Sequence, residues 1–145
     1  MPDETEYREN SEAVRAHLSI MQSVIQRMAA DSSSCKAWCI ALVSATLVIV
    51  ADKRKPEYAW LALIPTLLFL VLDAYYLALE HAFRASYNNF IDKLHRGRIK
   101  PSDLYAVVPS GSLFWHFLTA LRSVSVWPMY SALLVMIYMA RRLLM

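Results

Sequence analysis

The chain has 145 residues, of which 57% are hydrophobic and 19% are charged, and it contains two glycines, six prolines and two cysteines. This composition excludes a disordered protein, a disulfide-stabilised fold and an α/β enzyme with glycine-rich turns. The formal net charge is only +3 and the basic residues are scattered, so the sequence does not indicate nucleic-acid binding.

Three uncharged runs hold much of the hydrophobic content. They contain 15, 15 and 18 residues and lie between Lys36 and Asp52, between Glu57 and Asp73, and between Arg122 and Arg141. A chain of this size has no soluble interior that could bury all three runs. The sequence therefore predicts an all-α membrane protein, in which a transmembrane helical hairpin carries amphipathic cytoplasmic helix extensions and a hydrophobic C-terminal helix.

Residues 1–34 are predicted to form the cytoplasmic N-terminal amphipathic helix region, in which residues 1–10 are polar and frayed and the helical pattern starts after them. The segment has six acidic and three basic residues, so it is no signal peptide and the N-terminus is expected in the cytoplasm. Apolar residues repeat at spacings of four and three: Val14, Leu18, Met21, Ile25 and Met28. This stripe favours either packing within the chain or a contact between subunits of a homo-oligomer. Asp31 and the three serines after it are expected to break or cap the helix.

Residues 35–80 are predicted to form the transmembrane hairpin, with a short polar turn at residues 52–57. Asp73 interrupts the second span, and an ionisable group at this depth is costly unless it is paired or faces a cavity. If the turn is centred between residues 54 and 55, Asp73 lies level with Lys36. We therefore predict either a neutralising ion pair between them or a polar lining for a pore in an oligomer.

Residues 81–112 are predicted to form a second cytoplasmic amphipathic helix, ending near Gly97, and a loop. Its apolar side chains repeat at four, three and four and are expected to pack on the N-terminal helix: Phe83, Tyr87, Phe90 and Leu94. The basic patch at residues 95–100 fits either contact with anionic lipid headgroups or a solvated helix end.

Residues 113–145 are predicted to form a hydrophobic helical segment that is re-entrant, packed or a third span, with Pro128 interrupting it. With two crossings, 12 of the 15 Lys and Arg residues lie on the side of the termini, and with three crossings ten do. The positive-inside tendency favours two crossings, with both termini in the cytoplasm. The uncharged run of 18 residues measures roughly 27 Å as a helix, which is enough for a third crossing.

No catalytic, metal or cofactor site is predicted. Cys35 and Cys39 lie one helical turn apart, but a metal site needs two further ligands, and His17 and His81 have no matching spacing. The histidines lack a nucleophile with an orienting acid, and the two glycines do not form a phosphate loop. We therefore expect a protein that is not an enzyme.

Three segments carry a resemblance to a known family. They are the run from Leu72 to Glu80, Phe83 and Arg84 that follow it, and residues 123–130. With the hairpin at residues 35–79, this layout resembles the SLATT-type membrane proteins of bacterial conflict systems. The resemblance implies an oligomeric antiphage effector that breaches the bacterial inner membrane when a cytoplasmic sensor or nucleotide-signalling enzyme triggers it. In the alternative interpretation, the hairpin anchors a scaffold that recruits a cytoplasmic defence enzyme.

Overall fold

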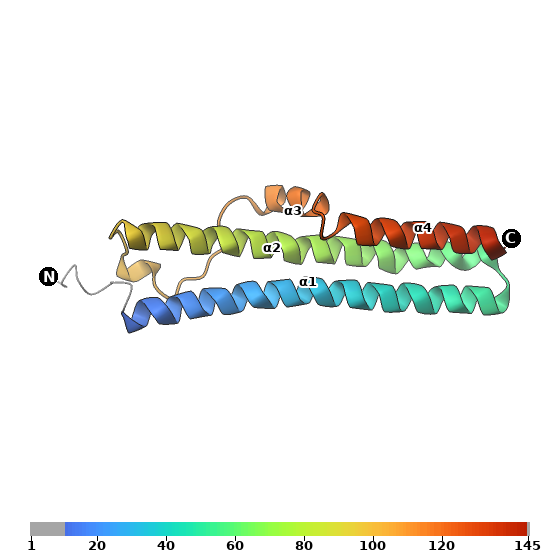
Figure 1. Ribbon diagram of the computed structural model, residues 1–145, viewed down its shortest axis with the longest axis horizontal. Helices are drawn as coiled ribbons and strands as arrows, with labels where there is room; N and C mark the ends of the chain where they lie inside the picture. Colours follow the sequence, from blue (N-terminus) through green and yellow to red (C-terminus); the bar gives the residue numbers. More distant parts are fainter. Residues whose placement is uncertain (1–10, 145) are drawn as a thin grey trace.

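The computed structural model describes residues 11–144, and within this range it is all-helical, with no strand. Its elements are α1 (Glu12–Lys53), the 3₁₀ helix η1 (Pro56–Ala62), α2 (Leu63–His95), the 3₁₀ turn η2 (Pro101–Asp103), α3 (Leu113–Leu121) and α4 (Trp127–Leu144). Helices α1 and α2 lie side by side and antiparallel, with α4 along the half of α2 nearest their connection (Figure 1). The first ten residues, which we expect to be frayed, lie outside the described residues.

Helix α1 is continuous over 42 residues, so the break expected at residues 31–34 is wrong. Its N-cap is Ser11, whose Oγ accepts a hydrogen bond from the Val14 amide at 3.3 Å. Neither glycine nor proline occurs between Ser11 and Pro56, so no residue in this stretch strongly opposes the helix. The predicted cytoplasmic helix and the predicted first span are therefore one rod.

The turn after α1 closes with a left-handed residue. Arg54 has φ 50° and ψ 40°, and the amides of Arg54 and Lys55 donate to the carbonyls of Ala51 and Val50. These two hydrogen bonds are the Schellman pattern of a helix end. Pro56 then occupies the first position of η1, where its missing N–H costs no helical hydrogen bond.

Helix α2 joins the predicted second span and the predicted second cytoplasmic helix without a break. It ends at His95, and Gly97 follows with φ +61°. The Gly97 amide donates to the Leu94 carbonyl and the Arg98 amide donates to the Lys93 carbonyl, at 3.1 and 2.9 Å. The prediction that this helix ends near Gly97 is confirmed.

Two apolar clusters divide the molecule along its length. The larger one joins α1, η1, α2, α3 and α4, and its buried members are Cys39, Val43, Ala62, Ala74, Leu77, Ala78, Ala120, Val126, Tyr130, Leu133 and Ile137. Three of these residues on η1 and α2 are alanines, which allows neighbouring helices to approach closely. The smaller cluster joins the N-terminal turns of α1 to the C-terminal turns of α2 and consists of Val14, Met21 and Phe90.

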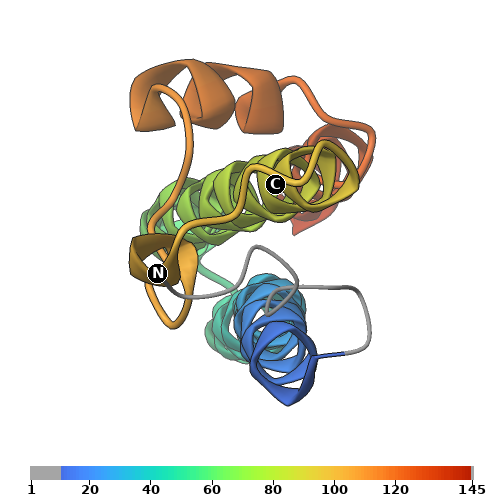
Figure 2. The ribbon, with the colours of Figure 1, turned by 90° about the vertical axis from the view of Figure 1, so that its left-hand side faces the viewer.

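The C-terminal segment consists of two helices with a break at residues 122–126. Pro128 lies in the first turn of α4 and does not interrupt it, which corrects the expectation from the sequence, because proline fits the start of a helix. Viewed along the bundle, α3 lies on the side of α2 opposite α1 (Figure 2). The C-terminal end of α4 lies at the same end of the molecule as the connection between α1 and η1 (Figure 1).

Within residues 11–144, two helices are long and apolar enough to cross a membrane, Glu12–Lys53 and Pro56–His95. Only part of each rod is apolar. We call residues 35–53 of α1, residues 56–79 of η1 and α2, and α4 the apolar half of the molecule. Residues 12–34 of α1 and residues 80–95 of α2 form the polar half.

Candidate functional site

An ion pair is buried between α1 and α2 near the junction of the two halves. Lys36 Nζ lies 2.6 Å from Asp73 Oδ1, as the register of the turn predicts. Ser32, one helical turn before Lys36, donates its hydroxyl to the same carboxylate oxygen at 2.5 Å. The Lys36 ammonium also donates to Ser32 Oγ at 3.1 Å. The side chain of Asp73 is 0% exposed and that of Lys36 is 20% exposed, so the pair is largely removed from solvent.

The other carboxylate oxygen of Asp73, Oδ2, has no hydrogen-bond partner among residues 11–144. Helix α4 closes the neighbouring surface of α2, where the Tyr130 hydroxyl donates to the Phe69 carbonyl at 3.0 Å. Phe69 is one helical turn before Asp73, and Tyr130 is buried. In a single chain the Asp73 carboxylate is therefore buried between the helices and has no contact with solvent. Of the two predicted arrangements, the structure of the monomer has the ion pair.

The apolar stripe on the N-terminal turns of α1 packs inside the chain. Val14 and Met21 are buried against Phe90 of α2, and Leu18 packs against the same cluster. These residues leave little surface for a second subunit, because Val14 is 0% exposed and Met21 is 2% exposed. Val14, Leu18 and Met21 therefore pack within the chain, which is the first of the two predicted roles of the stripe. Ile25 and Met28 are half-buried and belong to neither buried cluster.

The matching stripe on α2 supplies the other side of this contact. Phe90 is buried, and Tyr87 and Leu94 pack on the same cluster, as the periodicity predicts. Phe83 is half-buried and is a member of neither cluster. The Tyr87 hydroxyl also accepts a hydrogen bond from Gln22 Nε2 at 3.4 Å.

A histidine that the sequence did not single out joins the polar half to the loop after α2. His17 is 1% exposed, and its ring lies 4.4 Å from that of Phe90. Its Nδ1 accepts a hydrogen bond from the Tyr105 amide at 3.0 Å. Tyr105 has φ +62°, a left-handed conformation that is strained for a residue with a side chain. The hydrogen bond therefore holds a strained loop residue over α1.

The protonation state of His17 controls this contact. Burial lowers the pKa of His17 below its usual 6.5, and the opposing charge of Asp103 only partly offsets this. Protonation places a hydrogen on Nδ1, which then cannot accept from the Tyr105 amide. Because the folded-state pKa is lowered, this contribution to stability is fully present above the unfolded-state pKa and is lost as the pH falls below it.

We expect the Tyr105 amide to exchange its hydrogen faster at pH 5.5 than at pH 7.5, once both rates are corrected for intrinsic chemistry. Hydrogen exchange measured by mass spectrometry over residues 101–108 tests this expectation. Asp103 does not contribute in this range, since hydrogen bonds from Lys93 and Lys100 hold its pKa below 3.8. The variant His17→Gln should remove the pH dependence of protection, because an amide accepts hydrogen bonds but does not titrate. Equal pH dependence in both proteins would contradict the assignment.

Two cysteines lie beside the ion pair without forming a disulfide. Cys35 and Cys39 are both free and buried, and the Cys39 thiol donates to the Pro65 carbonyl at 3.9 Å. Among the described residues, no group of three or more His, Cys, Asp or Glu side chains could hold a metal ion. The candidate site is therefore a polar contact between helices, composed of Ser32, Lys36 and Asp73.

Comparison of the chain with family models, with curated proteins and with solved structures found no match.

Proposed function

We propose that the apolar half lies in the bacterial inner membrane and that the polar half lies in the cytoplasm. The observation that supports this placement most strongly is the apolar surface that surrounds the apolar half. Its exposed large hydrophobic residues come from all three helices and include Trp38, Ile40, Leu42, Val48, Ile49, Ile64, Leu67, Leu68, Val71, Leu134, Val135, Met136 and Met139. A surface of this extent is unusual for a soluble monomer and is typical of contact with lipid.

The edge of this surface coincides with features of a membrane interface. Lys36 and Asp73 lie there, and α3, which packs on α2, exposes Phe114 and Trp115. Aromatic side chains are enriched where the hydrocarbon meets the headgroups. On the surface of α1 before this edge, polar residues predominate among the exposed positions, such as Arg15, Gln22 and Arg27.

This placement makes α4 a third crossing because of its position against α1, η1 and α2, although its composition alone does not qualify it as a span. The helix has 18 residues, roughly 27 Å, and ends beside the turn at residues 53–56 (Figure 1). The guanidinium of Arg141 lies 4.9 Å from the centre of the Trp60 ring, which fixes the end of α4 at that level. Ten of the 15 Lys and Arg residues then lie on the cytoplasmic side, so the positive-inside tendency is still obeyed, with the C-terminus outside.

Within the membrane, the protein acts as a triggered effector. The resemblance to SLATT-type proteins supports an antiphage role, in which a separate cytoplasmic sensor or nucleotide-signalling enzyme activates it. The closed ion pair of the monomer corresponds to the resting state, because Asp73 and Lys36 neutralise each other away from any opening. In the active state, several copies assemble and permeabilise the bilayer.

Dye release from liposomes that contain the purified protein tests the effector function. We expect release when the protein is activated by its partner, and a change in assembly or in release for Asp73→Asn, which removes the charge opposite Lys36. The matched control is Asp52→Asn, because Asp52 is an exposed acid in the last turn of α1. A bilayer that stays sealed under every activating condition contradicts the effector function. Unchanged assembly and release in Asp73→Asn contradict a role for the ion pair.

The second candidate function is a membrane-anchored scaffold that recruits a cytoplasmic defence enzyme. The burial of Asp73 favours it, since a neutralised pair inside one chain supplies no polar pore lining. Replacement of residues 35–79 by the hairpin of an unrelated protein separates the two functions. A scaffold keeps its activity after this exchange, whereas an effector loses it.

A further inference from the structure

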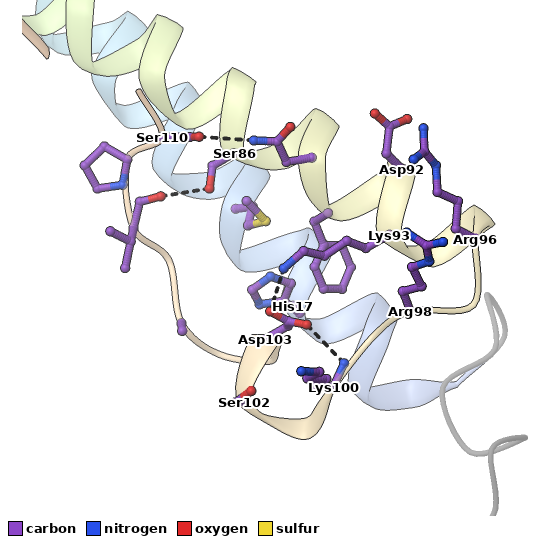
Figure 3. Close-up of a pocket in the computed structure, with 16 residues that line it drawn as sticks. His17, Ser86, Asp92, Lys93, Arg96, Arg98, Lys100, Ser102, Asp103 and Ser110 are labelled. Atoms are coloured by element: carbon purple, nitrogen blue, oxygen red, sulfur yellow. Dashed lines mark hydrogen bonds and ion pairs between the residues drawn. The ribbon is translucent and has the colours of Figure 1, made fainter. Parts of the chain in front are cut away.

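An open pocket of about 990 Å³ lies at the end of the polar half, far from the ion pair. Its walls come from the N-terminal turns of α1, from the C-terminal turns of α2, and from the loop between α2 and α3 (Figure 3). The loop is tied to α2 by two hydrogen bonds. Ser86 donates its hydroxyl to the Val108 carbonyl at 2.8 Å, and Asn89 Nδ2 donates to Ser110 Oγ at 3.1 Å. The third wall of the pocket is thus held in place.

The charges that line this pocket are mainly positive. Its basic residues are Lys93, Arg96, Arg98 and Lys100, and its acidic residues are Asp92 and Asp103. Asp103 is occupied on both oxygens, by the Lys93 ammonium at 2.8 Å and by the Lys100 amide at 3.0 Å. Among residues 11–144, the side chains of Arg96, Arg98 and Lys100 form no ion pair. Within these residues, three cationic side chains therefore remain without an ion pair, although Asp92 lies beside Arg96 and Asp103 lies beside Lys100 (Figure 3).

The end of α2 brings the two arginines to one side of the pocket. Gly97 takes φ +61° between the two arginines, and nothing lies within 4 Å of the position that a Cβ would occupy there. The Arg98 amide returns to the Lys93 carbonyl at 2.9 Å, so the chain reverses within one helical turn. Figure 3 shows the side chains of Arg96 and Arg98 on the same flank of the pocket, beside Lys93.

We propose that this pocket binds a soluble ligand through a phosphate or polyphosphate group. Guanidinium groups donate paired hydrogen bonds that match the oxygens of a phosphate, and ammonium groups add charge and further donors. The Ser102 hydroxyl also lines the pocket. A volume near 990 Å³ accommodates a ligand larger than the phosphate group itself.

The position of the pocket favours a soluble ligand over a lipid headgroup, a step that rests on the proposed membrane placement. Lys93 follows Leu79, the last residue of the apolar half on α2, by 14 residues in one continuous helix, which corresponds to roughly 21 Å. The headgroup region on each side of the hydrocarbon is only about 5–8 Å thick. With the apolar half in the membrane, the pocket therefore stands well clear of the lipid.

Calorimetric titration of the full-length protein in an uncharged detergent with inorganic pyrophosphate tests the proposal. We expect saturable binding at one site per chain. The double variant Arg96→Gln/Arg98→Gln should weaken this binding about tenfold or more, because each arginine contributes charge-assisted hydrogen bonds. The matched control Lys53→Gln/Lys55→Gln removes the same charge at the opposite end of the molecule and should change the affinity less than about twofold, since charges at this distance are screened.

Three outcomes overturn the proposal. The first is the absence of saturable binding by the wild-type protein. The second is an equal loss of affinity in both double variants, which indicates attraction to net charge alone. In the third, the arginine variant keeps its pyrophosphate affinity and loses only its association with nanodiscs that contain anionic lipid, which assigns the patch to headgroups. Thermal unfolding of each variant checks that it is folded. The titration needs no leakage measurement, so its failure is distinguishable from failure of the effector function.

Discussion

Replacement of Asp73 by alanine is expected to lower the free energy of unfolding by about 3–5 kcal/mol. The substitution leaves the Lys36 ammonium, which is 20% exposed, without its anionic partner at the contact between α1 and α2. It also removes the acceptor of the Ser32 hydroxyl. The first loss leaves the ammonium with Ser32 Oγ as its remaining partner, and the second leaves the Ser32 hydroxyl hydrogen without its acceptor. Titration of the detergent-solubilised protein with sodium dodecyl sulfate, followed by circular dichroism, measures the change.

Two further variants separate the ion pair from simple loss of packing. The double variant Lys36→Met/Asp73→Leu should be more stable than Asp73→Ala, because it removes both charges and fills the contact with apolar atoms. Asp52→Ala removes an exposed acid whose partner Lys53 lies 3.5 Å away, and it should cost less than about 1 kcal/mol. A cost for Asp73→Ala as small as that for Asp52→Ala would show that the buried pair contributes little.

The ion pair could be predicted from the sequence because it depends on local geometry. A short polar turn ending in Pro56 fixes where two antiparallel helices meet, and counting from it places Asp73 opposite Lys36. The end of α2 was predictable for a similar reason, since Gly97 supplies the left-handed residue that terminates a helix. These features require no knowledge of contacts between distant segments.

Features that depend on tertiary contacts could not be predicted from the sequence. Serine is a residue type that favours helix ends. Ser32 nevertheless lies within α1, where its hydroxyl donates a hydrogen bond to the Asp73 carboxylate on the neighbouring helix. The contact between His17 and the Tyr105 amide joins residues 88 positions apart. The pocket in the polar half depends on the same loop, whose course between Arg98 and Ser110 has no periodic pattern from which it could be predicted. The break before α4 could not be predicted either, because residues 122–126 contain neither glycine nor proline.

Substitution of Leu68 by arginine is expected to make membrane insertion less favourable by about 2.5–3.5 kcal/mol. Leu68 lies near the middle of the apolar stretch of α2, and its side chain is 57% exposed in the structure. In lipid, an arginine at this depth must carry its charge into hydrocarbon or distort the bilayer to reach water. We expect a clear fall in the amount of full-length protein that remains in the membrane fraction after alkaline carbonate extraction.

The same experiment distinguishes lipid from water as the surroundings of the apolar half. At a solvated surface, an exposed leucine replaced by arginine changes stability by less than about 0.5 kcal/mol, and it improves solubility by interrupting an apolar patch. Ile20→Arg is the matched control, because Ile20 is 42% exposed on α1 within the polar half and should tolerate the charge. If Leu68→Arg and Ile20→Arg both leave fractionation unchanged, or if Leu68→Arg enters the aqueous fraction as a folded protein, α2 does not face lipid. Because the third crossing, the orientation and the distance of the pocket from the bilayer all depend on that contact, this substitution tests them together.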